Sequence, residues 1–380
     1  MNRIPVSSLN DKKSKVNVEN PRCLELFLKS CKNKATRETY LNHLNAFLKH
    51  VEKDHQSFLM MPDVERNIIL EDYVMFCSDK DRYAVSSIRG IFSAIEKFLV
   101  VNDKMMNRKK LMMFLPEERK KSQRAITTEE ILLLLLVCAN PRQRAIVHLF
   151  CATGCRPEGM ADLKIKDMDF MVDGFTGILF YSGNNHELQS FSHPEATEAL
   201  NDYLETRKQE GEELTPETYV FSQVNCIGDE AGRMSADGIG SVIENLMKTS
   251  GIKRVKINKK RFDLPVCNGF RNRFNTIIKM LSDKNTISYA IAEKFMDHTL
   301  GVEASYLFPT KEALLKEYKK AVPQLVVSKE TRLMLENENK QKQIEDLESD
   351  KDIQINKMQL QIDSMLEMFS TAKELMKAKH

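Results

Sequence analysis

The sequence predicts a mainly α-helical fold with one small antiparallel β-sheet. Apolar residues recur at three- and four-residue spacing through most of its 380 residues, which is the period of amphipathic helices. Residues 175–181 and 187–191 favour strands, and the Ser-Gly-Asn-Asn run between them is typical of a hairpin turn. Neither Gly nor Pro follows Pro323, which predicts one long C-terminal helix.

The N-terminal third predicts an arm, a small domain and a linker. Residues 1–20 are polar and charged and predict an arm. Residues 21–101 predict a domain of four helices, the second of which starts at Thr36; the helices are expected at residues 23–31, 36–51, 64–77 and 84–100. Residues 102–125 are rich in Lys and Arg and predict a basic linker.

Residues 126–326 predict a second domain, which holds the hairpin. Thr127 or Thr128, followed by Glu129 and Glu130, is expected to cap its first helix. Further helices are expected in the same domain, and the full set lies at residues 131–137, 142–152, 194–208, 235–250, 268–281, 287–296 and 311–321.

Residues 327–380 predict a C-terminal coiled-coil helix. Apolar residues follow the 3-4-3-4 spacing of a heptad seam at Ile355, Met358, Ile362, Met365, Phe369, Ala372 and Met376. Upstream, Ile344 fits the seam, but Glu348 and Lys351 fall in it. We expect this helix to make a homo-oligomer, or to mix with a related chain. The alternative is a single amphipathic helix that folds back on its own domain.

Composition excludes several classes of protein. Charged residues make up 29% of the chain, and no run of about 18 apolar residues exists, so no membrane span and no membrane partner is expected. The N-terminus lacks the apolar stretch of a signal peptide. The eight cysteines include no Cys-x-x-Cys pair and have no zinc spacing, so we expect reduced thiols, no metal site and a cytoplasmic protein.

Positive charge is concentrated in two stretches, although the net charge is only +3. Residues 103–124 hold eight Lys or Arg against three acidic residues, and residues 252–261 hold six Lys or Arg and no acid. Such clusters are typical of phosphate binding; the alternative is a solvated surface and a basic linker. The candidate DNA contacts are Lys109, Lys110, Lys120, Lys121, Lys256, Lys259, Lys260 and Arg273.

Three short motifs occur in order in the second domain. Thr153-Gly154-Cys155-Arg156 ends an apolar helix at a glycine, which can adopt a left-handed cap and let Arg156 project from the turn. An Arg-rich segment at residues 268–274 follows, and then Met296-Asp297-His298 with Ser305-Tyr306-Leu307 after it. An arginine held at a turn can grip two phosphate oxygens at once.

This ordered set resembles the tyrosine recombinase, or phage-integrase, family over about residues 21–330. Residues 191–195, 203–207 and 305–310 look like the archaeal-type branch of that family. The resemblance implies a helical core-binding domain, a recombinase catalytic-type domain, a double-stranded DNA partner and a mobile genetic element in a prokaryotic host. The four residues that it implies as catalytic are Arg156, Arg271, His298 and Tyr306.

The resemblance also implies the chemistry. A Tyr hydroxyl attacks a DNA phosphate and forms a 3′-phosphotyrosine bond. Arg156 and Arg271 would stabilise charge on the phosphate oxygens, and His298 would handle protons. No metal or nucleotide cofactor is implied, because the phosphotyrosine keeps the energy of the broken bond.

The sequence departs from the family pattern in the proton-handling groups. The family's hairpin Lys has no counterpart, since residues 167–206 contain no Lys; Ser182, Asn184, Asn185 and His186 are the polar residues at that turn. Its first His is Asn268 here, and Asn272 replaces a basic residue. Asp297 replaces the glycine before His298, and Gly159 stands where an acidic residue is usual.

The expected nucleophile is also displaced. The family's Tyr lies nine residues after the His, which is Leu307 here, and Tyr306 is one short. One residue turns a helical side chain by about 100°. Three alternatives follow: Tyr306 acts through a shifted register, the chain binds DNA without cutting it, or other groups such as His186 replace the missing ones. Tyr306 could also simply pack beside Phe308, and His298 could be a buried, hydrogen-bonded histidine.

Two classes of function therefore remain. One is a site-specific integrase that exchanges strands through phosphotyrosine, with a type IB topoisomerase as a more distant variant of the same chemistry. The other is a catalytically inactive relative that binds DNA and occupies or regulates recombination sites.

Overall fold

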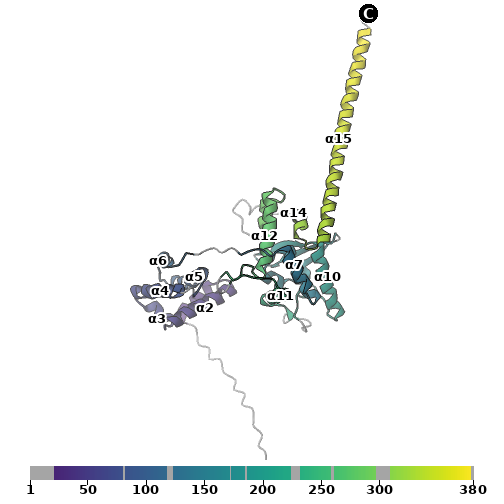
Figure 1. Cartoon of the computed structure of the whole chain (residues 1–380). Helices are drawn as coiled ribbons and strands as arrows, with labels where there is room; N and C mark the ends of the chain where they lie inside the picture. Colours follow the sequence, from purple (N-terminus) through teal and green to yellow (C-terminus); the bar gives the residue numbers. More distant parts are fainter. Residues whose placement is uncertain are drawn as a thin grey trace, which may run out of the picture. The chain divides into compact units, whose positions relative to one another are not determined.

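The computed structural model describes residues 21–79, 82–117, 123–171, 173–184, 186–223, 232–257, 261–296 and 309–377 (Figure 1). The chain divides into two units, Met1–Lys120 and Lys121–His380. Helices predominate in the described residues, and the strands form one antiparallel sheet of three. The predicted mainly α fold with a small sheet is confirmed.

The first unit is a helical bundle with an aromatic core. Its described elements are α1 (Arg22–Ser30), α2 (Lys34–His50), α3 (His55–Met60), α4 (Asp63–Ser78), α5 (Val85–Val100) and α6 (Arg108–Met112). Phe27 and Phe98 pack edge to face, as do Phe47 and Phe58.

Two details of this unit differ from the expectation. The side chain of Asn33 accepts hydrogen bonds from the amides of Ala35 and Thr36, so α2 begins at Lys34 and the expected start at Thr36 is wrong. The short helix α6 lies inside the expected linker and buries Leu111 in the core of the unit.

The second unit holds the remaining elements. Its helices are α7 (Thr128–Leu136), α8 (Pro141–Thr153), α9 (Pro157–Asp162), α10 (Pro194–Gln209), α11 (Ala236–Thr249), α12 (Asn268–Asp283), α13 (Tyr289–Phe295), α14 (Lys311–Leu325) and α15 (Lys329–Lys377), with a 3₁₀ turn at Ile165–Asp167. Thr127 and Glu130 form a capping box at the start of α7, as the sequence predicts.

The sheet has the order β1-β2-β3, with β1 at Met168–Phe170, β2 at Thr176–Phe180 and β3 at Leu188–Ser192. Ile178 in the middle strand pairs with Met168 on one side and Ser190 on the other. The predicted hairpin is β2 and β3; β2 is one residue shorter at each end than expected, and β3 has the expected length but is shifted by one residue. Strand β1 was not predicted, because three residues are too few to show alternation.

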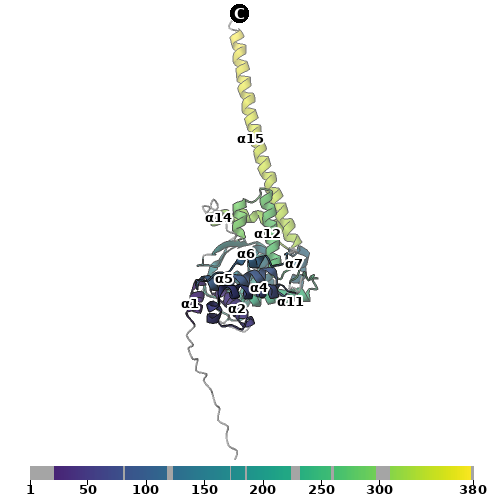
Figure 2. The ribbon, with the colours of Figure 1, turned by 90° about the vertical axis from the view of Figure 1, so that its left-hand side faces the viewer.

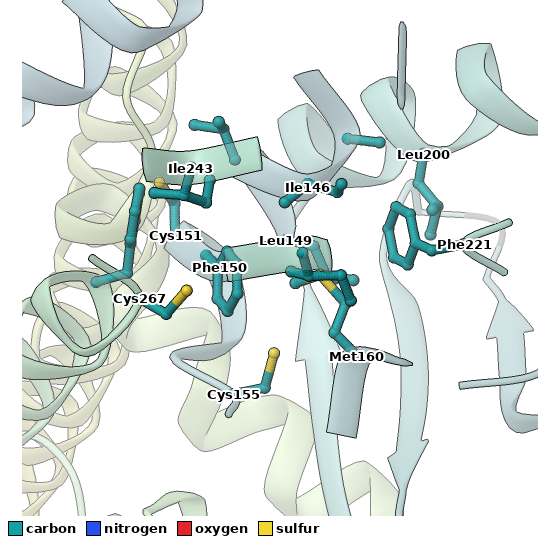
Figure 3. Close-up of a cluster of buried hydrophobic side chains, with 14 of the residues drawn as sticks. Ile146, Leu149, Phe150, Cys151, Cys155, Met160, Leu200, Phe221, Ile243 and Cys267 are labelled. Atoms are coloured by element: carbon teal, nitrogen blue, oxygen red, sulfur yellow. The ribbon is translucent and has the colours of Figure 1, made fainter. Parts of the chain in front are cut away.

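Helix α8 is the hub of the second unit. Every residue from Ala145 to Thr153 is buried, so this helix is covered on all sides. Figure 3 shows Ile146, Leu149 and Phe150 of α8 meeting side chains from α9 and α11. Because α8 is packed on all sides, its neighbours constrain the turn at its C-terminal end.

The C-terminal helix α15 runs unbroken for 49 residues, which corresponds to about 73 Å. Figures 1 and 2 both show it as one continuous helix. In the part of the chain that the structure describes, no helix combines the length and apolar character that a membrane span requires. The described cysteines are all free thiols.

Candidate nucleic-acid interface

The turn at Gly154 joins α8 to α9 and carries Arg156. Gly154 has a φ of 56°, so it adopts the left-handed cap that the sequence predicts. A Cβ at this position would lie 2.6 Å from the Cβ of Phe274 on α12. Only glycine therefore lets α12 pack directly against the turn. Arg156 precedes the first turn of α9, and its side chain is exposed.

Arg271 reaches the same turn from α12. Its Nη1 donates to the carbonyl oxygen of Gly154 at 3.0 Å, across 117 positions of the sequence, and its Nη2 donates to the carbonyl oxygen of Met296. The side chain is half-buried, so these carbonyls fix its orientation. The fold thus brings together the two arginines that the motifs single out.

The other expected catalytic residues, His298 and Tyr306, lie outside the described residues, as does Leu307. Asn268 opens α12 one turn before Arg271. Cys155 lies beside Arg156, but burial raises the pKa of its thiol to about 12, so it stays neutral and is no candidate nucleophile. Across the described ranges, no three His, Cys, Asp or Glu side chains are grouped to hold a metal ion.

Arg273 does not fit the expectation that it contacts DNA. Its side chain is buried, and its guanidinium donates to the carbonyl oxygens of Leu325 at 3.1 Å and Gln324 at 2.8 Å. These carbonyls lie at the C-terminal end of α14, where a cation is favourable. Arg273 is therefore a structural residue that holds α14 on α12.

The second basic stretch forms a small hairpin. Lys256 pairs with Phe262 in an antiparallel bridge, and the amide of Ile257 donates to the carbonyl oxygen of Arg261 at 2.8 Å. The guanidinium of Arg254 lies 4.2 Å from the centre of the Phe262 ring. Lys256 is exposed, whereas Lys259 and Lys260 lie outside the described residues. We refer to the described residues 253–257 and 261–263 as the basic hairpin.

Arg124 ties the basic hairpin to the end of the first basic stretch. Its side chain bonds to Asp263 at 3.0 Å and to both carboxylate oxygens of Glu130, and these hydrogen bonds, that of Glu130 first, raise its pKa. Its carbonyl oxygen accepts from the amide side chain of Asn272, next to Arg271. The basic hairpin, the end of the linker and the start of α12 are thus neighbours.

Of the four lysines expected to bind DNA in the first basic stretch, two are among the described residues. Lys109 and Lys110 are exposed on α6 of the first unit, and Lys110 forms an ion pair with Glu71. Lys120 and Lys121 lie outside the described residues.

Tyr181 was not expected to be a functional residue. It follows β2, and its hydroxyl is hydrogen-bonded to the side chain of Arg156. A tyrosine at the end of a strand normally indicates packing, so its partner could be found only from the fold.

The chain has similarity to known proteins in sequence and in fold. No family model matches the chain. Tyrosine recombinase XerC of Lactobacillus delbrueckii subsp. bulgaricus is 32% identical over 112 residues, which are 29% of this chain and 35% of the relative. XerC of Lactobacillus leichmannii is 31% identical over 111 residues, with the same coverage. The chain thus spans about a third of the length of the curated relatives that it matches.

Among solved structures, the Tn1549 transposon integrase in complex with a circular intermediate DNA is 14% identical, with a TM-score of 0.50. The alignment covers 78% of this chain and 99% of that one. At this identity the likeness concerns the fold. The chain is therefore similar to tyrosine recombinases in sequence over part of its length, and it shares the fold of a transposon integrase over most of it.

Proposed function

We propose that this chain binds duplex DNA on a recombinase-type scaffold and that Arg156 and Arg271 grip a phosphate between them. One observation carries the proposal: the hydrogen bond from Arg271 to the carbonyl oxygen of Gly154, which brings the second arginine to the turn that presents the first. Two guanidinium groups that are oriented before DNA arrives lose little conformational freedom on binding, and each can donate two parallel hydrogen bonds.

The lysine clusters would add contacts to the DNA backbone. Exposed ammonium groups on the basic hairpin and on α6 suit phosphates of any sequence. The proposed contacts are Lys109, Lys110, Lys120, Lys121, Lys256, Lys259 and Lys260. Residues 191–195 and 305–310 favour the archaeal-type integrase branch, whose DNA would belong to a mobile genetic element.

The proposed chemistry of this scaffold is phosphotyrosine strand exchange, with His298 and Tyr306 as its remaining participants. The second candidate function is DNA binding without cleavage, by a chain that occupies or regulates recombination sites. The missing hairpin Lys, Asn268 in place of a His, and Tyr306 one position short favour the second. Loss of one general acid alone typically costs ~10²–10⁴ in rate.

The experiment has two stages. Duplexes that the protein retains are first selected from a random-sequence pool, and affinity is compared for the wild type, Arg156→Ala, Arg271→Ala and the control Lys248→Ala. Each arginine variant should weaken binding by at least about tenfold, since a charge-assisted contact contributes ~1.5–3 kcal/mol, and the control should not. Equal affinity for all four proteins would contradict the phosphate grip.

The selected duplexes are then nicked and incubated with the protein, and adducts are sought on a denaturing gel. We expect little or no adduct from the wild type, none from Tyr306→Phe, and at most a weak signal from Leu307→Tyr. Abundant wild-type adduct that maps to Tyr306 would instead establish an active recombinase with a displaced nucleophile.

We also propose that α15 pairs with the α15 of a second copy. Ile355, Met358, Ile362 and Met365 of the heptad seam are each about half exposed. The positions that would flank the seam across a parallel pair include Gln354, Gln359 and Gln361, so no like charges oppose self-association there.

A further inference from the structure

Tyr181 has an unusual backbone conformation for its residue type. It lies between β2 and the hairpin turn and has a φ of 56°, in the left-handed region. Its carbonyl oxygen accepts a hydrogen bond from the amide of Asn184 at 2.9 Å, which closes the turn. A large aromatic residue adopts this conformation only when its surroundings hold it there.

The ring of Tyr181 packs on Gly159 of α9, where any other residue would place a side chain. A Cβ at Gly159 would lie 2.9 Å from Cζ of Tyr181 and 3.0 Å from its hydroxyl oxygen. Gly159 is a buried helical residue without a positive φ, so its own backbone does not require glycine. The space that it leaves is filled by the end of the tyrosine side chain that carries the hydroxyl.

The hydroxyl of Tyr181 meets Arg156, which lies three positions before Gly159. A guanidinium only donates hydrogen bonds, so the hydroxyl oxygen is the acceptor and the phenolic proton remains available for another acceptor. Burial raises the pKa of Tyr181, so its hydroxyl stays protonated at neutral pH.

We propose that Tyr181, seated on Gly159, is a positioning residue that orients Arg156 toward the DNA phosphate. This inference rests on the proposed function of Arg156 and adds a partner to it. Gly159 and Tyr181 act together. The glycine leaves space for the ring, the backbone conformation of the turn directs the ring into that space, and the hydroxyl orients the guanidinium of Arg156.

A double-mutant cycle tests the proposal. The affinity of a labelled mixed-sequence duplex at low salt is measured for the wild type, Tyr181→Phe, Arg156→Ala and the combination. Tyr181→Phe keeps the ring and removes only the hydroxyl, and it should weaken binding by roughly 3- to 30-fold. In the Arg156→Ala background it should cause no further loss, whereas its effect should add in full to that of the remote Lys256→Ala.

Two comparisons separate positioning from simple packing. Tyr203→Phe removes another part-buried hydroxyl, which accepts from the amide of Ser222 at 3.3 Å, and it should leave affinity unchanged. Gly159→Ala should reproduce the loss seen in Tyr181→Phe, because its Cβ displaces the ring, and should have no effect when Tyr181 is already Ala. Thermal unfolding of each protein shows whether it is folded.

The outcomes are distinct. If the wild type binds duplex DNA but Tyr181→Phe weakens binding equally with and without Arg156, or not at all, the positioning role is overturned and the proposed function stands. If the wild type does not bind duplex DNA, the proposed function fails, and this inference fails with it.

Discussion

Arg271 and Arg273 lie two positions apart on α12 and have opposite roles in the structure. Two positions turn a helical side chain by about 200°, so one arginine faces the Gly154 turn and the other faces the end of α14. The sequence places both in one basic motif and does not distinguish them. Burial separates them: Arg273 is only 6% exposed, whereas Arg271 is half-buried and keeps a solvent-accessible part that a phosphate can reach.

At Gly154, the backbone conformation and the packing of α12 both require glycine, and the two contributions can be separated. Gly154→Ala should lower the free energy of unfolding by about 2–4 kcal/mol, since it adds left-handed strain and a clash with Phe274. Gly183→Ala is the matched control: its φ is also positive, at 77°, but a Cβ there meets nothing within 4 Å. It should cost only about 1 kcal/mol. Equal losses in chemical denaturation would show that α12 does not press on the turn.

At the scale of the elements, the arginines and the lysines of the basic hairpin have different roles. Its strands are joined by backbone hydrogen bonds and by the contact of Arg254 with Phe262, while Asp263 receives Arg124. These two arginines serve the structure. We expect the exposed lysines of the hairpin to contact DNA and therefore to contribute to the salt dependence of binding.

Replacing Lys253 and Lys256 with Ala should reduce the salt dependence of DNA binding. If each contacts one phosphate, the slope of log affinity against log salt should become shallower by ~1.8. The control replaces Lys208 of α10 and Lys248 of α11, which are exposed and pair with Glu205 and Glu244 of the same helices. A slope that the hairpin variant leaves unchanged would remove this element from the interface.

The sequence predicted the longer elements and one part of the site. Hydrophobic periodicity located the longer elements, which repeat their pattern: α1, α2, α4, α5, α7, α8, α10 to α15 and the β2–β3 hairpin. It missed α3, α6, α9 and β1, which are too short to show a period. The order of the motifs paired Arg156 with Arg271. The role of Tyr181 could not be predicted, because it depends on the contact of this residue with Gly159, which belongs to a different element.

At the scale of the whole molecule, α15 combines a fixed base with an exposed length. Glu195 of α10 accepts hydrogen bonds from the amides of Val327 at 2.8 Å and Ser328 at 2.9 Å, just before the helix begins. Leu335 packs on the core of the second unit. Beyond that point Ile344, Ile355 and Met358 are among the apolar residues left exposed, and a helix of this length gains most of its stability from packing.

Removing residues 341–380 should therefore lower the oligomeric state of the protein without unfolding it, since the base of α15 is retained. Light scattering should give fewer chains per particle for the truncated protein, and its affinity for a single duplex site should be largely unchanged. In the full chain, Met358→Glu with Met365→Glu should have the same effect, because two charges would enter the seam. Asn356→Glu with Ser364→Glu adds the same charge outside the seam and should leave the mass unchanged. The same number of chains per particle in all four proteins would contradict pairing through α15 and would favour a helix that packs on its own chain.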